Sequence, residues 1–445
     1  MGQSATEQVA FARGERRIEA HFDLDEVTSD GGLLWLAEAD DELGLSVALA
    51  TVVPEWRRGP VRHSLASLVR QRVFQIACGY PDQNDATTLR HDPLLQLSCD
   101  HPGVLASQPT LSRLGAPWAN AVDEASCAAL AEVLLDCFLA QREQNGPPGY
   151  VLLDLDSTDD PTHGEQEGSA YHGYYRQHMY HPLLAFDGTT NQLLSARLRP
   201  GNAHASRDAV DEVQRIVAAM RSRWPGVTID LRADGGFAVP ELYDFCEAER
   251  IEYAIGLIPN TRLDALAAPL LALAMAAYDQ TQEPVRLIGE TRYQADSWPH
   301  PRRVIIKAEV SAHGTNTRFV VTTRKDAPEM LYAWYIERGE TENWVKDFKR
   351  ATPRGHPADR LSCSRFCANQ FRLLLHAAAY WLLDTLRRWL GRRGVPRMQL
   401  DTLRLRLIKI GGWVRQLTNR VRIHLASSHP GQPLWHLLAT RPDRP

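Results

Sequence analysis

The sequence has few cysteines and no long uninterrupted apolar run. Seven cysteines are spread thinly over 445 residues, and this odd, sparse set argues against a disulfide framework and for reduced thiols. No apolar stretch near the N-terminus has the length of a signal peptide. The most apolar segment, 373–390, contains His376, Asp384 and the pair Arg387 and Arg388, which indicates a buried helix. We therefore expect a cytoplasmic protein with no membrane partner.

The chain also lacks the net positive charge expected of a protein that binds a polyanion. Lys and Arg number 50 against 54 Asp and Glu, which gives a formal net charge of −4. The segment 346–422, however, carries 18 Lys and Arg but only four Asp, a net charge of +14 that leaves −18 elsewhere. One end of the sequence is therefore suited to a polyanion. Its 44% hydrophobic and 23% charged residues are typical of globular proteins and exclude disorder as the main state.

The apolar spacing predicts a helical first part and an α/β second part. Residues 1–145 are expected to be mostly helical, at 33–39, 65–76, 120–141 and, in a shorter helix, 107–114. After the GPPG turn at 146–149, strands are predicted at 150–156, 179–187, 192–199, 228–233 and 252–258. Helices are predicted at 206–224, capped by Ser206, and at 240–250. This order predicts an α/β fold with a mixed sheet.

The alternation stops after residue 258. A helix at 263–277 and strand-like runs at 285–288, 303–310 and 318–323 predict a β-rich insertion over 259–330. A long helix is expected to begin near Leu331 and to continue into the basic segment. A second helix is expected over 368–390, followed by strand-like runs at 403–410 and 421–426.

Carboxylates lie where an α/β fold builds a site, at the carboxyl ends of strands. Asp156 ends the first predicted strand, and Asp154 lies two residues earlier on the same face. Asp234 ends the fourth strand in RADGGF, 232–237, where two glycines permit a tight turn and the close approach of another backbone or a phosphate.

Glu342 is a further candidate acid, on the helix that leads into the basic segment. Four residues of that helix fall within an arc of roughly 60° at about 100° per residue: Tyr335, Arg338, Glu342 and Lys349, with Lys346 beside them. A solvated helix face with i,i+4 ion pairs explains this pattern equally well. The alternative is a metal-assisted phosphoryl-transfer site, because carboxylates hold Mg²⁺ while Arg and Lys hold phosphate oxygens.

The spacing of these four residues resembles the Y-R-E-K signature of DDE transposases of the insertion sequence 4 superfamily. The order of strands and acids resembles their RNase H-like core, with a β-rich insertion between the second and third acids. Further motifs are similar to those of the insertion sequence 1380 family, over about residues 20–430. They are DLDSTDDPTHGEQEG (154–168), HGYY (172–175), LRPGNAHAS (198–206), LRADGGF (231–237), GYPDQNDATTLRHDP (79–93) and SQPTLSRL (107–114). One departure is Gly115, where the resemblance implies an acid.

The resemblance implies a role for each residue of the signature. The catalytic residues and metal ligands would be Asp156, Asp234 and Glu342, holding two Mg²⁺ ions for which Mn²⁺ can substitute, with Asp154 as the alternative to Asp156. The DNA-binding residues would be Tyr335, which positions the terminal phosphate, with Arg338, Lys346 and Lys349 on phosphates.

The same resemblance divides the chain into five parts. Residues 1–145 would be a helical DNA-binding or dimerisation domain, and 146–258 the first part of an RNase H-like core. Residues 259–330 would be the insertion, 331–390 the helical second part of the core with the catalytic Glu, and 391–445 a basic C-terminal segment.

Trp298, in YQADSWPHPRR (293–303), lies in the predicted insertion. In transposases of the superfamily that form a hairpin intermediate, insertion-domain aromatics stack on a flipped base, and stacking contributes about 1–3 kcal/mol per base. Arg302 and Arg303 beside it favour the same contact with DNA. A tryptophan in the core or in an edge strand is the equally weighted alternative.

Four histidines cluster at positions 163, 172, 178 and 181. No cysteine accompanies them and their spacing is not that of a known finger, so hairpin structure or DNA contact is favoured over zinc. His163 and His172 are expected to border the active site. Cys363 and Cys367, at helical spacing in an apolar context, are read as core thiols rather than half of a metal site.

These features predict a transposase that performs Mg²⁺-dependent strand cleavage and strand transfer in cut-and-paste transposition. Its partners would be double-stranded DNA, namely the terminal inverted repeats and the target, and a second copy of the chain in the synaptic complex. We expect it in the bacterial cytoplasm, associated with the nucleoid. The alternatives are a non-catalytic DNA-binding protein descended from a transposase and a stand-alone RNase H-type nuclease.

Overall fold

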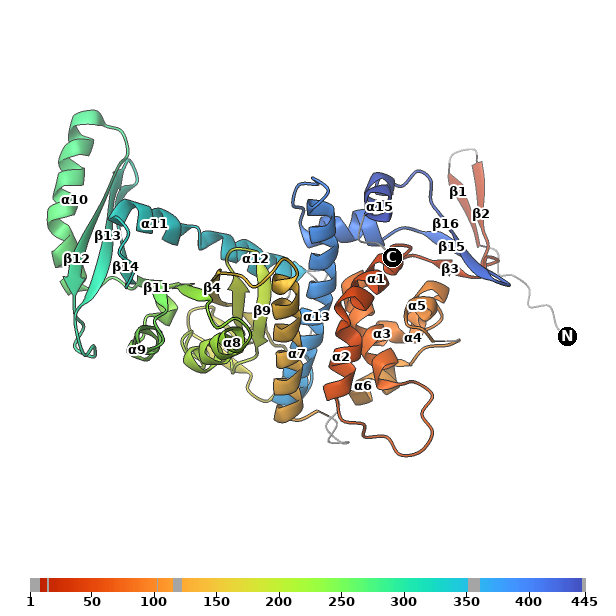
Figure 1. The fold of residues 1–445 in the computed structure, drawn as a ribbon. Helices are drawn as coiled ribbons and strands as arrows, with labels where there is room; N and C mark the ends of the chain where they lie inside the picture. Colours follow the sequence, from red (N-terminus) through yellow and green to blue (C-terminus); the bar gives the residue numbers. More distant parts are fainter. Residues whose placement is uncertain (1–8, 14–15, 102, 115–121, 351–360, 442–445) are drawn as a thin grey trace.

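The computed structural model describes residues 9–13, 16–101, 103–114, 122–350 and 361–441, so Gly115 lies outside the described residues. The central helix α13 (Phe366–Gly391) separates a group of N-terminal helices from an eight-stranded sheet (Figure 1). It contacts α1 (Leu33–Leu43) and α3 (Leu65–Cys78) on one side, and α7 (Glu124–Glu143) and β9 (Gln192–Arg197) on the other. The buried helix predicted from the apolar run 373–390 is therefore confirmed.

The N-terminal part is mostly helical, as predicted. Besides α1, α3 and α7 it contains α2 (Leu45–Val52), α4 (Ala86–Leu89), α5 (Pro93–Ser98) and α6 (Gln108–Leu114). Local capping explains several starts, because Ser64 accepts a bond from Ser67 N–H before α3 and Asp123 from Ser126 N–H before α7. An antiparallel pair not singled out by the sequence pattern, β1 (Val9–Arg13) with β2 (Arg16–Ala20), precedes the helices.

The sheet has the order β12–β13–β14–β11–β10–β4–β8–β9. Four of its predicted strands are confirmed as β4 (Tyr150–Ser157), β9, β10 (Thr228–Ala233) and β11 (Glu252–Leu257). The strand predicted at 179–187 is two strands: β8 (Leu183–Asp187) lies in this sheet, whereas residues 179 and 180 belong to β7 (Gln177–Tyr180) of a smaller sheet. β10 lies parallel to both β4 and β11, whereas β8 and β9 are antiparallel, so the sheet is mixed. Helices α8 (Ala209–Arg223) and α9 (Pro240–Ala248) connect the parallel strands. The residue before α8 is Asp208 rather than the predicted cap Ser206.

The segment predicted as an insertion continues the same sheet. β14 (Gly314–Thr322) pairs antiparallel with β11, and β13 (Arg302–Ser311) and β12 (Val285–Tyr293) follow outward. The helix α10 (Thr261–Thr281) packs along β12 and β13 at this end of the molecule (Figure 1). By length and composition alone α10 could cross a membrane, which is weak evidence, and in this fold its Leu263, Ala267 and Ala274 are buried.

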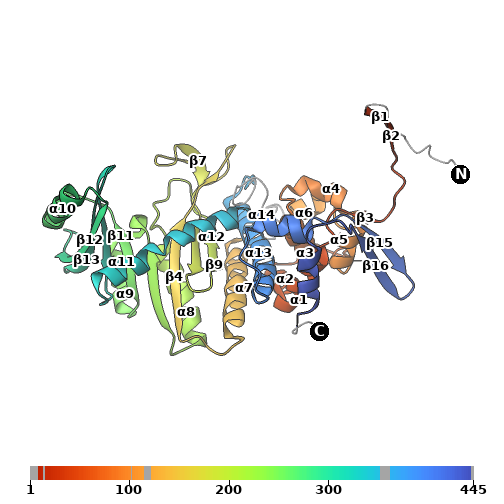
Figure 2. The same cartoon turned by 90° about the horizontal axis from the view of Figure 1, so that it is seen from above.

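The long helix expected from Leu331 is two helices. α11 (Pro328–Ile336) ends before residues 337 and 338, and α12 (Gly339–Arg350) begins after them. α11 contacts β12 and β13 and α12 contacts β4, so the two helices run along one face of the sheet (Figure 2).

The strand predicted at 403–410 is wrong. The Leu and Arg residues alternate there, but residues 400–408 form α14 (Leu400–Leu403) and a π-helical turn (Arg404–Ile408). Burial has a helical period, because Leu400, Leu403, Leu407 and Ile408 are buried while Leu405 is exposed. The chain continues into the hairpin β15 (Gly412–Leu417) and β16 (Arg420–Leu425), whose second strand was predicted, and ends with α15 (Gln432–Ala439).

Candidate active site

Asp154 and Asp156 share a face of β4 by strand period, but their surroundings differ. The Asp154 carboxylate is fully buried and accepts two bonds, of 2.8 and 2.7 Å, from the guanidinium of Arg232 on β10. Arg232 also donates to the backbone oxygen of Trp334 in α11, at 2.6 Å. Asp154 is therefore engaged in an ion pair that joins β4 and β10 to α11, which favours Asp156 as the first acid.

Asp156 lies at the carboxyl end of β4, with its Oδ2 3.7 Å from Nη1 of Arg338. Its Oδ1 accepts a bond of 2.8 Å from Ser157 N–H. Burial raises the pKa of Asp156 to about 7, Arg338 opposes the rise, and the charges of Asp234 and Glu342 add to it. Asp156 therefore lies within electrostatic reach of both other predicted acids, as expected of a functional acidic site.

Asp234 lies in a tight turn directly after β10. Its Oδ1 accepts a bond of 2.9 Å from Gly236 N–H and so fixes the turn. A Cβ at Gly236 would lie 2.7 Å from the Cβ of Ala205, and a Cβ at Gly256 of β11 would lie 2.6 Å from the hydroxyl of Tyr335. Glycine is therefore required at both positions, as RADGGF predicted for the first, because neighbouring segments approach the Asp234 turn this closely.

The loop 198–208, which contains Ala205, is held by the buried side chain of Arg199. Its guanidinium donates to the backbone oxygens of His181, Ala205 and Arg207, at 2.8, 2.6 and 2.7 Å. These bonds fold the LRPGNAHAS segment against the Asp234 turn. The motif thus has a structural role beside the site.

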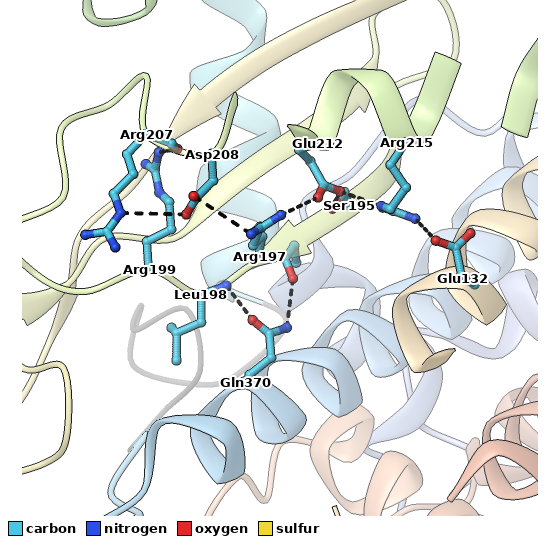
Figure 3. A network of polar contacts seen from close by, with 11 residues as sticks. Glu132, Ser195, Arg197, Leu198, Arg199, Arg207, Asp208, Glu212, Arg215 and Gln370 are labelled. Atoms are coloured by element: carbon cyan, nitrogen blue, oxygen red, sulfur yellow. Dashed lines mark hydrogen bonds and ion pairs between the residues drawn. The ribbon is translucent and has the colours of Figure 1, made fainter. Parts of the chain in front are cut away.

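A network of polar contacts ties the start of this loop to three helices (Figure 3). Gln370 of α13 accepts a bond from Leu198 N–H and donates to the Ala196 carbonyl. Glu212 of α8 lies 3.5 Å from Arg197 and also pairs with Arg215. Arg215 also forms an ion pair with Glu132 of α7, at 2.9 Å. The start of the loop is therefore attached to α13, α8 and α7.

The break between α11 and α12 decides where the side chains of Tyr335, Arg338 and Glu342 lie. Arg338 N–H donates to Tyr335 C=O and Thr341 N–H to Arg338 C=O, a three-residue spacing, so angles taken along one continuous helix are wrong here. The turn nevertheless directs Tyr335 and Arg338 to the sheet, where the Tyr335 hydroxyl donates to the Ala233 carbonyl at 3.4 Å. Burial opposes charge on Arg338, but Asp156, Tyr335 and Asp234 hold its pKa above the ordinary value. Glu342 follows in the first turn of α12 with an exposed side chain.

Lys349, in the last turn of α12, is paired with Asp159. The Nζ–Oδ1 distance is 2.6 Å, and Gln177 of β7 (Gln177–Tyr180) donates to the other oxygen of Asp159 at 3.0 Å. Lys346 is exposed one turn earlier. Asp159 is part of the DLDSTDD motif but was not among the predicted site residues, although a carboxylate three residues after Asp156 was the available signal. Contact of Lys346 and Lys349 with phosphates stays a prediction.

Two tyrosines of the HGYY motif also border the site, and the sequence analysis missed them. Burial raises the pKa of Tyr175 to about 12, and the charges of Asp159 and Asp156 contribute. Its ring lies 5.1 Å from that of Tyr174, which is 85% exposed. An exposed aromatic ring beside an acidic site is suited to stacking on a base.

Two of the four clustered histidines, His172 and His178, lie in the small sheet of β5 (Asp160–Pro161), β6 (Ala170–His172) and β7. His172 lies next to Tyr175, with ring centroids 5.1 Å apart, and so near the site as expected. His181 is buried, its Nδ1 lies 2.8 Å from the Ala203 carbonyl, and burial lowers its pKa to about 4. His163 is exposed. Cys367 lies 3.5 Å from Cys127, sulfur to sulfur, which agrees with packed thiols.

Trp298 and Arg302, two of the residues predicted to contact DNA, are buried in the structure. Trp298 is only 6% exposed and packs edge-on against Tyr243 and Tyr293. Arg302 is buried over the Trp298 ring and pairs with Glu247 at 2.7 Å. Arg303 pairs with Glu290. Trp298 therefore packs in the core with Tyr243 and Tyr293, as the alternative interpretation of this residue had it.

The three predicted metal ligands have the chemistry of a hard-cation site. Asp156, Asp234 and Glu342 offer carboxylate oxygens, the ligands that Mg²⁺ prefers. In the part of the chain that the structure describes, no three His, Cys, Asp or Glu side chains lie close enough together to hold a metal ion. Asp156, Asp234 and Glu342 therefore lie near one another but do not form a complete metal-binding site in this structure. Nη1 of Arg338, buried and without a hydrogen-bond partner, faces the same space beside Asp156.

A family model described as transposase DDE domain group 1 matches residues 11–443 of the chain. Among solved structures, the chain is similar to a piggyBac transposase synaptic complex with hairpin DNA, with 12% identity over 85% of this chain and 80% of that one and a TM-score of 0.43. A Mos1 transposase paired-end complex with the left transposon end shares 12% identity over 45% and 60% of the two chains, with a TM-score of 0.17. A Mos1 mariner paired-end complex with Mn shares 10% identity over 68% and 82%, also with a TM-score of 0.17. The comparison with curated proteins found no match to this chain.

Proposed function

Because the chain belongs to the family of transposase DDE domain group 1, we propose that it is the transposase of an insertion sequence, which binds terminal inverted repeats and cleaves DNA at them. Its motifs place it, in this proposal, in the insertion sequence 1380 family of the insertion sequence 4 superfamily. One observation carries the proposal: the parallel pairing of β4 and β10, with Leu155 opposite Ala233, brings Asp156 and Asp234 to the same edge of the sheet, and the charge of Glu342 on α12 also acts on Asp156.

The strand arrangement supports an RNase H-like core for this function. Asp156 lies on β4, the first strand of the mixed sheet, and Asp234 directly follows β10, the fourth. Glu342 lies on α12, which packs across β4. This is the order of acids that the resemblance implies for such a core.

The reaction proposed is hydrolysis of a phosphodiester at the transposon end, followed by attack of the released 3′-OH on DNA. Two Mg²⁺ ions held by Asp156, Asp234 and Glu342 would activate the attacking oxygen and stabilise the leaving one. Asp156, with a pKa of about 7, must lose its proton from the carboxyl to serve as a ligand. Arg338 would bind a phosphate oxygen through its buried Nη1, which makes no hydrogen bond and lies 3.7 Å from Asp156, and Tyr335 would position the terminal phosphate.

The partners proposed are the two inverted-repeat ends and the target DNA. Since both ends must be held together for transposition, we propose that two copies of the chain form the synaptic complex. The two copies would act in the bacterial cytoplasm, at the nucleoid.

The test is strand cleavage of a duplex that carries the terminal inverted repeat flanking the gene, in the presence of Mg²⁺. Replacing Glu342→Gln or Asp156→Asn is expected to reduce the cleavage rate at least about 100-fold, since loss even of an outer-shell partner costs 10–100-fold. Glu340→Gln is the matched control, because Glu340 lies on the same helix and bonds Asn343 at 3.1 Å, away from the acids. Its rate is expected to stay near that of the wild type.

Equal cleavage by wild type and Glu342→Gln would show that Glu342 is not catalytic. Binding without cleavage by the wild type would favour the non-catalytic DNA-binding protein. Cleavage of any duplex at equal rate, with no requirement for the inverted repeat, would favour a nuclease.

A further inference from the structure

The hairpin β15–β16 projects from the side of the molecule that holds the N-terminal helices (Figures 1 and 2). Its base is attached to the body through β3 (Val27–Thr28), which pairs only with Gly412 and Trp413 of β15. Beyond these two residues the ribbon has no further neighbour in its three-stranded sheet. Its outer part therefore exposes two unpaired strand edges, which in a folded protein usually need protection or a partner.

One face of the ribbon gathers positive charge. By strand alternation the register places Trp413, Arg415 and Leu417 on the same face as their partners His424, Arg422 and Arg420. All three arginines are exposed, and within the described residues none of them forms an ion pair. Arg415 lies directly opposite Arg422, an arrangement that is destabilising unless something anionic lies against it.

The surrounding sequence does nothing to offset this charge. No Asp or Glu occurs between Asp401 and Asp443, so both strands, their turn and the flanking segments are free of acids. The nearest acids in the same sheet precede β3, at the base of the ribbon. The guanidinium of Arg415 lies over the Trp413 ring, 5.0 Å from its centroid, and this ring also stacks on His424. The stacked rings and guanidinium give the face a fixed shape as well as a charge.

The dimensions of the ribbon fit double-helical DNA. Six residues in each strand span about 20 Å at roughly 3.3 Å per residue, and the major groove, about 12 Å wide, admits a two-stranded β-ribbon. Arginine is the side chain best suited to phosphate oxygens at the groove edges. A second copy of the chain is a poorer partner, because two such faces would repel each other.

We propose that the β15–β16 ribbon binds the backbone of duplex DNA through Arg415, Arg420 and Arg422. The choice of partner rests on the proposed function, whereas the site itself lies outside the acidic centre. The ribbon adds affinity that does not depend on sequence, and it holds DNA at a position separate from the acids on β4, β10 and α12.

The experiment measures binding of the full chain to a 30-bp duplex of arbitrary sequence, with EDTA present so that cleavage plays no part. The variant carries Arg415→Gln, Arg420→Gln and Arg422→Gln. Because each phosphate contact contributes roughly 0.9 to the slope of log K against log salt, the slope should fall by roughly 2.7, and affinity near 0.15 M salt should fall at least about tenfold. A misfolded fraction would lower the number of active molecules without changing this slope.

Two further variants complete the test. Arg292→Gln, Arg318→Gln and Lys325→Gln remove the same charge from exposed positions on or beside the β12–β14 end of the sheet, and should leave the slope near that of the wild type. Lysine at 415, 420 and 422 keeps the charge and should keep the slope. An unchanged slope in the ribbon variant, or an equal loss in the charge-matched control, would overturn the proposal. The proposal would also be overturned if the ribbon variant lost affinity for a polyglutamate peptide by the same factor as for DNA. Failure of the wild type to cleave DNA would contradict the proposed function without affecting this measurement.

Discussion

At the scale of single residues, two aspartates two positions apart on β4 have different physical roles. Asp154 is enclosed and neutralised by the bidentate contact with Arg232, whereas Asp156 is only half-buried, beside an arginine that reaches it only at 3.7 Å. A buried charge without its partner is far more costly than a partly exposed one. The difference assigns Asp154 to holding the sheet together and leaves Asp156 as the aspartate that the proposed function needs as a cation ligand.

Replacing Asp154→Asn is expected to lower the free energy of unfolding by about 3 kcal/mol, because the buried Arg232 guanidinium loses its counter-charge. Asp156→Asn should change it by less than about 1 kcal/mol, since Asp156 makes no close ion pair. Urea unfolding at pH 7, followed by circular dichroism, measures both. Equal costs for the two variants would contradict the assignment of separate roles.

At the scale of elements, α12, which carries Glu342, packs against α13. Arg387 of α13 is buried and pairs with Asp347 of α12 at 2.6 Å, and His376 of α13 lies 2.9 Å from the Phe348 carbonyl of α12. Arg387 interrupts the apolar run that predicted a buried helix. Its ion-pair partner could not be predicted from the sequence, because Asp347 lies 40 residues away. The position of Glu342 therefore depends on contacts that α12 makes with another helix.

The packing of α12 on α13 is expected to weaken at acidic pH. Burial lowers the pKa of His376 to about 4, against 6.5 for the exposed side chain. Between these two values His376 is protonated in the unfolded chain but neutral in the folded chain. Stability is therefore complete above about pH 6.5 and falls as the pH drops toward 4, by about 2 kcal/mol between pH 7 and pH 5 for this group.

The measurement is the free energy of unfolding across that pH range for the wild type and for His376→Gln, whose amide can still donate to the Phe348 carbonyl. The variant should lose about 2 kcal/mol of the pH dependence. His313→Gln, at an exposed turn between β13 and β14, serves as the control and should retain it. Identical pH dependence in all three proteins would rule out His376 as the titrating group.

At the scale of the whole molecule, α13 is shared by two bodies that would otherwise each expose an apolar face. It contacts α1 and α3 on one side and α7 and β9 on the other, and its residues are buried almost all round. A helix that is apolar on every side belongs to the interior, and here it provides core to both the helical part and the sheet. We therefore expect the two bodies to unfold together.

Leu382→Ala, at a fully buried position of α13, should cost about 2–5 kcal/mol and should lower amide-exchange protection in α3 and β9 by similar factors. Leu405→Ala removes the same atoms from a side chain that is 64% exposed, and should have little effect. Loss of protection in only one of the two bodies would show that they unfold separately.

The sequence by itself determined the features that depend on neighbouring residues. The strand at 228–233, the helix over 65–76 and the glycine requirement after Asp234 follow from local periodicity and turn chemistry. These features need no knowledge of distant contacts, because each residue's neighbours in the chain supply the interaction.

Only the tertiary structure decided the rest. Arg232, 78 residues further along the chain, removes Asp154 from the site, and the cluster of Tyr243 and Tyr293 encloses Trp298. The alternating segment 403–410 forms helical turns that bury Leu403, Leu407 and Ile408, and the helix expected from Leu331 ends at Ile336, where Tyr335 contacts the Ala233 carbonyl of the sheet. In each case the sequence allowed two conformations or two partners of similar energy. Burial by residues distant in the chain selected one, because desolvation and packing act through space and not along the sequence.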